Sequence, residues 1–315
     1  MSRLLVATGE ALVRVDGREA DVLLERPGLH AVAVDPGSPD RIAAGCRGAG
    51  VWESDDGGST WRDAALPAPD VFSVAFGPDG ALYAGCEPSA LYVRRAGAPW
   101  LELAALRELP SAPTWSFPPR PWTSHVRWIA PSPHDAGVVL VGIELGGLMR
   151  TDDGGETWAD HRPGAQRDVH ALAWHPTEPG RAYEAAGGGA AKSRDGGETW
   201  EPADEGRDRH YTWALAVDPV DSGRWYVSAA PGPFEAHGSR PAQAALYRWS
   251  GDGPWEELDL GLPRPLEAMP YALAWSDGRL VAGLRDGRLL ESEDGGDTWR
   301  DGAAAGLGRL VAMAA

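Results

Sequence analysis

A short alternation of apolar and polar residues recurs along the chain and predicts its secondary structure. One copy, residues 30–36, reads HAVAVDP, with side chains that alternate between two faces before a turn at proline. This period of two is typical of β-strands. Each copy is followed by two more short apolar runs and by a strand that follows a tryptophan. We therefore predict four-stranded units near residues 29–64, 71–106, 122–161, 168–204, 210–259 and 269–303.

The two ends of the chain supply one further unit. Residues 308–313 have a pattern similar to that of the first strand of a unit, and residues 3–7, 11–15 and 21–25 provide the other three strands. Sharing a unit between the two termini closes a ring of sheets and removes the last open sheet edge. The sequence therefore predicts an all-β, seven-bladed β-propeller of four-stranded blades, forming a single domain over residues 1–315.

A second repeated pattern, S/T-x-D-x-G-x-T-W, marks the turn before the last strand of a unit. Full copies occupy residues 54–61, 151–158, 193–200 and 292–299, and degenerate copies occupy 91–100 and 246–255. The hydroxyl and carboxylate groups can hydrogen-bond the backbone of a tight turn, glycine allows positive φ, and tryptophan packs against neighbouring strands. Because the role repeats in each unit, we interpret the aspartates as scaffold rather than catalytic acids: Asp56, Asp153, Asp195 and Asp294.

These four copies resemble the Asp-box, or BNR, repeat family, which includes sialidases, sortilin-type receptors, xyloglucanases and photosystem II assembly factors. The resemblance implies a propeller but leaves the function open. The Arg-Ile-Pro motif of sialidases is missing from this sequence, and seven blades replace their six, so a typical sialidase is not expected. Xyloglucanase-like members pair two propellers, whereas this chain has the length for one.

Charge and cysteine content narrow the choice of partners and compartment. The chain has 46 acidic and 29 basic residues and a net charge of −17, which would repel a nucleic-acid backbone. Its two cysteines, Cys46 and Cys86, are too few for a disulfide framework and are interpreted as small buried residues. Residues 1–25 lack the pattern of a signal peptide, and no apolar run is long enough to span a membrane. We therefore expect a cytoplasmic protein with neither a nucleic-acid nor a membrane partner.

Residues that depart from the repeat at the start of each first strand are candidates for function, because equivalent positions meet around the axis of a propeller. Alignment of these strands on their proline, or its equivalent, gives one residue for each blade: His30, Phe72, His125, His170, Trp213, Tyr271 and Arg309. The loops between second and third strands add Glu10, Arg47, Glu87, Glu144 and Arg285 to the same face. Two longer segments, 107–121 with Trp115, Phe117 and Arg120, and 231–243 with Phe234, Glu235, His237 and Arg240, could wall a pocket there.

Three interpretations of this ring remain open. In the first, His30, His125 and His170 bind one divalent transition metal ion, and Glu144 or Glu87 supports the ligands or acts as a general base. Tyr271 and Arg309 then face the open side of the ion. In the second, no metal is needed: histidine and tyrosine exchange protons with a sugar or similar molecule while arginine neutralises a carboxylate, as in a lyase. In the third, these side chains only fill a wet channel mouth.

Two classes of function follow. The first is an enzyme, a hydrolase or lyase, that acts on a small molecule or glycan at the axial mouth. Its catalytic residues would be Glu144, Tyr271 and Arg309, and its substrate-binding residues Arg47, Glu87, Trp213 and Arg285. The second is a scaffold whose mouth binds a protein partner. A concave pocket with converging titratable groups favours the enzyme, and a broad exposed patch favours the scaffold.

Overall fold

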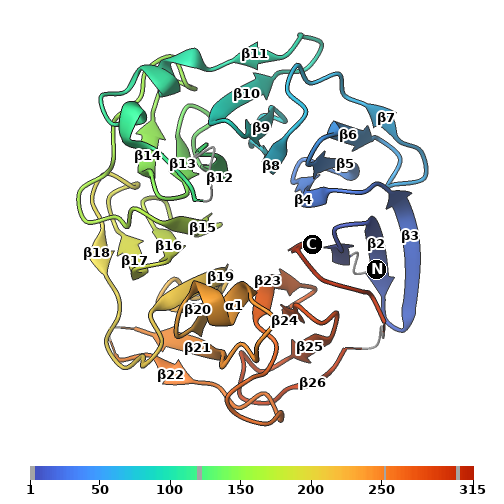
Figure 1. The fold of residues 1–315 in the computed structure, drawn as a ribbon, viewed down its shortest axis with the longest axis vertical. Coiled ribbons are helices and arrows are strands. Elements are labelled where there is room, and N and C mark those ends of the chain that lie inside the picture. The colour runs from blue at the N-terminus through green and yellow to red at the C-terminus, as the bar shows by residue number, and fades with distance from the viewer. Residues whose placement is uncertain (1–3, 119–122, 252, 303–305) are drawn as a thin grey trace.

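The strands form sheets that stand side by side around a central axis (Figure 1). The computed structural model describes residues 4–118, 123–251, 253–302 and 306–315. Within these residues there are seven sheets, which confirms the predicted seven-bladed propeller. Each blade begins with its innermost strand and ends at the rim, and adjacent strands of a blade are antiparallel. No helix in the described ranges is long and apolar enough to cross a membrane.

The blades have the following bounds. Blade one contains β4 (Leu29–Asp35), β5 (Ser38–Cys46), β6 (Gly50–Ser54) and β7 (Arg62–Asp63). Blade two contains β8 (Val71–Phe76), β9 (Leu82–Cys86), β10 (Ala90–Arg94) and β11 (Leu101–Glu102), followed by the 3₁₀ helices η1 (Ala104–Glu108) and η2 (Ala112–Thr114). Blade three contains β12 (Val126–Pro131), β13 (Val139–Ile143) and β14 (Gly147–Thr151). Blade four contains β15 (Val169–Trp174), β16 (Ala182–Ala186), β17 (Gly189–Ser193) and β18 (Glu201–Pro202).

The other blades follow the same plan. Blade five contains β19 (Tyr211–Val217), β20 (Arg224–Ala230), the helix α1 (Pro233–His237), β21 (Ala245–Ser250) and β22 (Glu256–Glu257). Blade six contains β23 (Pro270–Ser276), β24 (Arg279–Leu284), β25 (Leu289–Ser292) and β26 (Arg300–Asp301). Blade seven contains β27 (Ala312–Ala314), β1 (Leu4–Ala7), β2 (Ala11–Asp16) and β3 (Glu19–Glu25). In blade three the predicted fourth strand is reduced to one bridge between Arg150 and Ala159.

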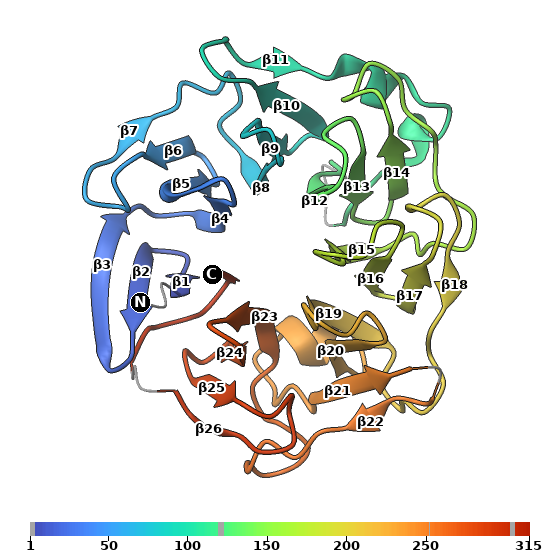
Figure 2. The same ribbon diagram turned by 180° about the vertical axis from the view of Figure 1, so that it is seen from behind.

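The two ends of the chain meet in blade seven, as predicted (Figure 2). β27 pairs with β1 through Leu5 with Ala314, Val6 with Met313 and Ala7 with Ala312. The inner strand predicted at 308–313 therefore begins later, at Ala312. Arg3, which the prediction placed in the next strand, lies outside the described residues.

The cores lie between blades rather than inside them, because each sheet presents its two faces to its neighbours. In β16, for example, Tyr183 packs on Trp225 of blade five, whereas Ala182 belongs to a cluster with Leu140 of blade three. Cys46 and Cys86 are buried free thiols in such cores, which confirms their expected role as small buried residues.

The Asp boxes brace the turns that lead to the outermost strands. In the box of blade three, the buried Thr151 hydroxyl donates to Asp153 at 2.7 Å and accepts the Gly155 N–H at 3.0 Å. Asp153 in turn accepts the Thr157 N–H and hydroxyl. These hydrogen bonds hold the pKa of Asp153 below its usual range. Third strands run away from the loops that join second and third strands, so the boxes lie at the opposite end of the sheets from those loops.

Glu184 is an exception among the buried side chains of the second strands. It occupies the third position from the end of β16, where other blades carry Ala44, Ala84, Val141, Ser228 and Ala282. The carboxyl group is fully buried, and its oxygens lie 3.0 and 3.2 Å from the Gln166 backbone N–H. Burial raises its pKa to about 8. Glu184 is therefore protonated in the folded protein at neutral pH.

Removal of residues 308–315 should open the ring. The deletion removes the three residue pairs between β27 and β1 and the fully buried Leu310, so we expect a loss of several kcal/mol and a melting temperature lower by more than about 5 °C. Calorimetry measures the change. Arg309→Ser, at an exposed position of the same segment, is the control. A truncated protein that melts like the full chain would contradict closure by β27.

Thr151→Val should destabilise the box of blade three without affecting the mouth. The substitution keeps the shape of the side chain but leaves the Gly155 N–H without its acceptor, which costs about 1–3 kcal/mol. Urea unfolding measures the loss, with the exposed Glu156→Ala as control. Unchanged stability combined with lost ligand binding would refute the scaffold role.

Glu184 should make the protein less stable at higher pH. Its pKa is raised in the folded state from 4.5 to about 8, so its favourable contribution is fully present below about pH 4.5 and is lost as the pH rises through 8. Glu184→Gln removes the ionisable group. The unfolding free energy of Glu184→Gln, relative to that of the wild type, should therefore increase as the pH rises from 5 to 8. A difference independent of pH would show that Glu184 does not titrate in this range.

Candidate functional site

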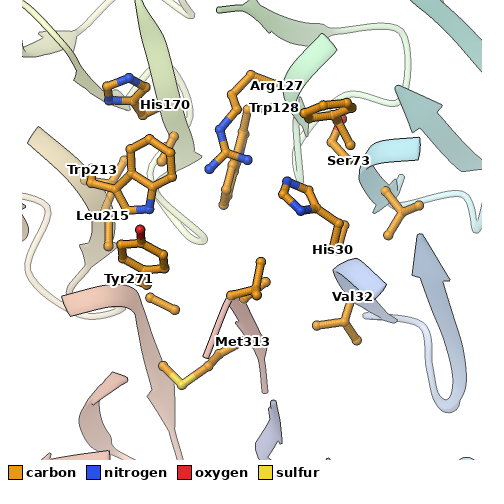
Figure 3. A pocket seen from close by; sticks show the side chains of 18 of the residues that line it. His30, Val32, Ser73, Arg127, Trp128, His170, Trp213, Leu215, Tyr271 and Met313 are labelled. Atoms are coloured by element: carbon orange, nitrogen blue, oxygen red, sulfur yellow. The ribbon is translucent and has the colours of Figure 1, made fainter. Parts of the chain in front are cut away.

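A β-bulge near the start of the inner strand in blades one to six aims a side chain of that strand towards the axis. The register shifts around His30, Phe72, Arg127, His170 and Tyr271, and in blade five around Trp213 and Ala214. Bulges often re-aim side chains next to active sites. Together with Val311 of blade seven, these residues line a channel cavity of about 140 Å³ on the axis (Figure 3).

Two positions of the predicted ring are therefore wrong. In blade three the bulged residue is Arg127, and His125 precedes it by two residues. Pro131 is the last residue of β12 and Pro133 follows it, and the register of the other blades matches Pro133 rather than Pro131. In blade seven Val311 lines the channel, whereas Arg309 is exposed and lies at the rim of the mouth. The other predicted positions, His30, Phe72, His170, Trp213 and Tyr271, all line the channel.

The mouth above this channel is concave. A cavity of about 810 Å³ is walled by aromatic and charged side chains from blades one to five, including Phe72, Arg127, Glu144, Asp168 and Trp213. A second cavity, of about 670 Å³, lies on the side of blade seven. His30, Arg127 and Trp213 line both of these and the channel cavity as well, so they form the neck between mouth and channel.

His170 is held in one tautomer by the backbone. Its Nδ1 lies 2.6 Å from the carbonyl oxygen of Thr212, which can only accept, so Nδ1 carries the hydrogen. Nε2 is buried and has no hydrogen-bond partner in the described part of the chain. It lies 3.6 Å from Asp168 Oδ2 and 4.0 Å from Glu144 Oε1. Nε2 is therefore the ring nitrogen that faces the two carboxylates.

Glu144 is an ionised carboxylate in a buried place. His125 Nε2 donates to its Oε2 at 2.7 Å, and Arg127 Nε lies 3.6 Å from the same oxygen. Burial alone would raise the pKa of Glu144, but the hydrogen bond from His125 and the charges of His170 and Arg127 lower it to about 2. Glu144 is thus an anion that can serve as a metal ligand.

The structure groups Glu144, Asp168 and His170 rather than three histidines. One ligand atom from each of these residues lies within 4.8 Å of the others, a cluster that could hold a metal ion. No other such group occurs among the described residues, so the predicted set His30, His125 and His170 is not assembled around one point. Phe72 separates two members of that set: it stacks on His125 at 3.9 Å and contacts His30 edge-on at 5.1 Å.

A second polar cluster joins blades five and six. His237, at the end of α1, lies between two tyrosines: its Nε2 is 2.8 Å from the Tyr211 hydroxyl, and its Nδ1 is 2.8 Å from the Tyr271 hydroxyl. Burial and the charge of His170 lower the pKa of His237 to about 4. A neutral imidazole has one donor and one acceptor. One tyrosine therefore donates to the ring, and the other keeps its own O–H proton for another partner.

The remaining predicted residues surround the mouth. Arg47 pairs with Glu87 at 2.9 Å and lies over the Phe72 ring at 4.3 Å. Arg285 donates to the Gly238 carbonyl at 2.6 Å and thereby ties the 231–243 segment to blade six. His30 has a pKa lowered to about 3 by burial and by the charges of Arg127 and Arg47, so it is neutral.

The two long segments have different places. Of residues 107–121, Trp115 is buried, whereas Phe117 walls the mouth and packs edge-on against His125 at 5.0 Å. Arg120 lies outside the described residues. In the 231–243 segment, Phe234 and His237 line the mouth, and Arg240 lies further out at the rim.

Three functional candidates escaped the sequence reasoning: Asp168, Arg127 and Tyr211. Asp168 stands two residues before His170, in the loop that enters β15, and Tyr211 stands two residues before Trp213, as the first residue of β19. Both would have been found by including, for each inner strand, the residue two positions before the bulged residue. The same search places His125 and Arg127 together in blade three.

Comparison with known proteins supports the fold. No family model matches the chain. Over 265 residues, the chain is 26% identical to the photosystem II assembly lipoprotein Ycf48 of Synechococcus sp., a match covering 79% of this chain and 68% of the relative. Among solved structures, it resembles the GH74 xyloglucanase from Xanthomonas campestris, with a TM-score of 0.73, 17% identity and 94% of this chain covered. This chain spans 52% of that enzyme.

A third match is a structure described as YCF48 bound to D1 peptide. Its TM-score is 0.61, at 20% identity, and the match covers 87% of this chain and 82% of the other. The solved structures share the ring of blades, and the sequence match adds a likeness that extends over most of the chain. The chain is a Ycf48/BNR-like seven-bladed β-propeller.

Proposed function

We propose that the axial mouth is the active site of an enzyme that acts on a small molecule or glycan with the help of one divalent transition metal ion. The observation that carries this proposal is the buried Nε2 of His170, which faces Glu144 and Asp168 at the edge of a cavity of about 810 Å³. Concave sites with a few converging titratable groups are the usual form of small-molecule sites.

The chemistry of the cluster fits a metal such as zinc or manganese. An imidazole nitrogen with its hydrogen on the other nitrogen, together with two carboxylates, is a common donor set for these ions. The Thr212 carbonyl fixes the imidazole from behind, and His125 fixes Glu144, as the outer partners of metal ligands usually do. Asp168 Oδ1 is also buried without a partner among the described residues.

The residues of the mouth have complementary tasks in such a reaction. A bound metal would polarise a substrate oxygen or lower the pKa of a water molecule. Tyr271 or Tyr211, set by His237, keeps an O–H proton that can be donated to a leaving group. Trp213 and Phe72 offer aromatic surfaces to an apolar face of the substrate, and Arg47 and Glu87 bound the opening.

The comparisons favour two kinds of ligand. The likeness to a xyloglucanase supports a glycan, although this chain spans only 52% of the length of that enzyme. The likeness to Ycf48, one structure of which holds a D1 peptide, supports a protein partner as the second candidate function. In this chain Phe234 favours the second candidate, because its side chain lies on the wall of the mouth and is 85% exposed.

Metal analysis separates these functions. Protein produced without a histidine tag, stripped with chelator and titrated with Zn²⁺ or Mn²⁺ should bind one ion per chain. His170→Gln and Asp168→Asn should each weaken binding by at least roughly tenfold, because each removes a direct ligand. Calorimetric titration measures the affinity, with the exposed His210→Gln as control.

The possible outcomes of this titration favour different functions. Absence of stoichiometric metal, or unchanged binding in His170→Gln, would refute the metal site. If metal is absent but Tyr271→Phe abolishes turnover, the metal-free interpretation with His237 and Tyr271 replaces it. If Phe234→Ser releases a protein partner while neither metal nor turnover is found, the docking function replaces both.

A further inference from the structure

Arg127 is placed at the neck of the channel by the bulge of β12. Its side chain is 11% exposed, and Figure 3 shows the guanidinium group between Trp213 and His30, inside the pocket. The guanidinium carbon lies 4.5 Å from the centre of the Trp213 ring. This contact restrains the guanidinium group before any ligand arrives.

This guanidinium group is not satisfied by the protein. Its Nε is 3.6 Å from Glu144, beyond hydrogen-bond length, and is buried without a hydrogen-bond partner. Within the described ranges, no hydrogen bond to its terminal nitrogens occurs. Two other arginines of the mouth are satisfied, because Arg47 binds Glu87 at 2.9 Å and Arg285 binds a carbonyl at 2.6 Å. A largely buried cation without hydrogen bonds is costly, and a ligand that supplied acceptors would remove this cost.

The channel cavity next to Arg127 has the character of an anion site. Its volume is about 140 Å³, and no acidic residue is among those that line it. Its polar lining includes His30, Ser73, His170 and Tyr271, and most of the rest is apolar. Ser73 is already used, since its hydroxyl donates to the Val126 carbonyl. His30 and Tyr271 are two further groups that can donate to a ligand here.

We propose that this cavity binds a small carboxylate, held by the terminal nitrogens of Arg127 at the neck of the channel. The planar fork of a guanidinium group matches the two oxygens of a carboxylate. The cavity limits the anion to a few non-hydrogen atoms, or to the carboxylate end of a longer molecule that extends through the neck into the mouth. The proposal deepens the proposed function by naming the substrate class, and it rests on the mouth being a ligand site but not on the metal.

The test uses the full chain in the presence of chelator, so that its outcome is independent of the metal. Acetate, lactate and succinate are titrated by calorimetry beside their neutral amides, with phosphate and sulfate as other anions. At least one carboxylate should bind, and its amide should bind at least roughly tenfold more weakly. Arg127→Met should lose at least the same factor. Arg14→Met, at a partly exposed position on blade seven away from the channel, makes the same change in net charge and should bind like the wild type.

Arg127→Lys keeps the charge but loses the fork, so it should bind several-fold more weakly than the wild type and still fold if Arg127→Met does not. Equal binding of carboxylates and amides, binding of phosphate or sulfate alone, no binding of any carboxylate, or full affinity in both Arg127 variants would overturn the proposal. Stoichiometric metal with no carboxylate binding would remove this inference alone. Carboxylate binding without metal would remove only the metal site.

Discussion

The pairing of β27 with β1 is the contact on which the rest of the structure depends. Three residue pairs join the two ends of the chain and turn a row of sheets into a ring. Only in a closed ring do equivalent positions of different blades face a common axis. His170 and Arg127 belong to different sheets, and Glu144 lies between them because blades three and four are fixed side by side. The site is therefore a consequence of closure rather than of any local motif.

Residues of the same type have different roles at the two ends of the sheets. The aspartates of the boxes are exposed and accept hydrogen bonds from their own turn, so their charge is used within a few residues. Glu144 and Asp168 lie at the other end, where the partners of Glu144, His125 and His170, come from another strand and from another blade. Repetition identifies the first group as scaffold, and departure from repetition identifies the second as a candidate site.

The fold could be predicted well from the sequence because the same repeat occurs several times along the chain. Each Asp box and each alternating strand is independent evidence for the same blade, and an error in one copy is corrected by the others. The site has no such redundancy. Pro131 and Pro133 lie two residues apart, and choosing the first as the anchor moved the ring position in blade three from Arg127 to His125. Asp168 precedes β15 and Tyr211 is the first residue of β19, and only the bulge that follows each of them shows that such residues reach the mouth.

Charged side chains are distributed unevenly about the neck, and this distribution would favour one orientation of a charged ligand. On the mouth side, Glu144 and Asp168 lie close to His170, an arrangement that attracts a cation. On the channel side no acidic residue lines the cavity, and Arg127 presents donors that the protein leaves unused. Arg127 lies between the two and lowers the pKa both of Glu144 and of His30. A ligand with a carboxylate at one end and a metal-binding oxygen further along would satisfy both sides at once, because its charge pattern would match that of the neck.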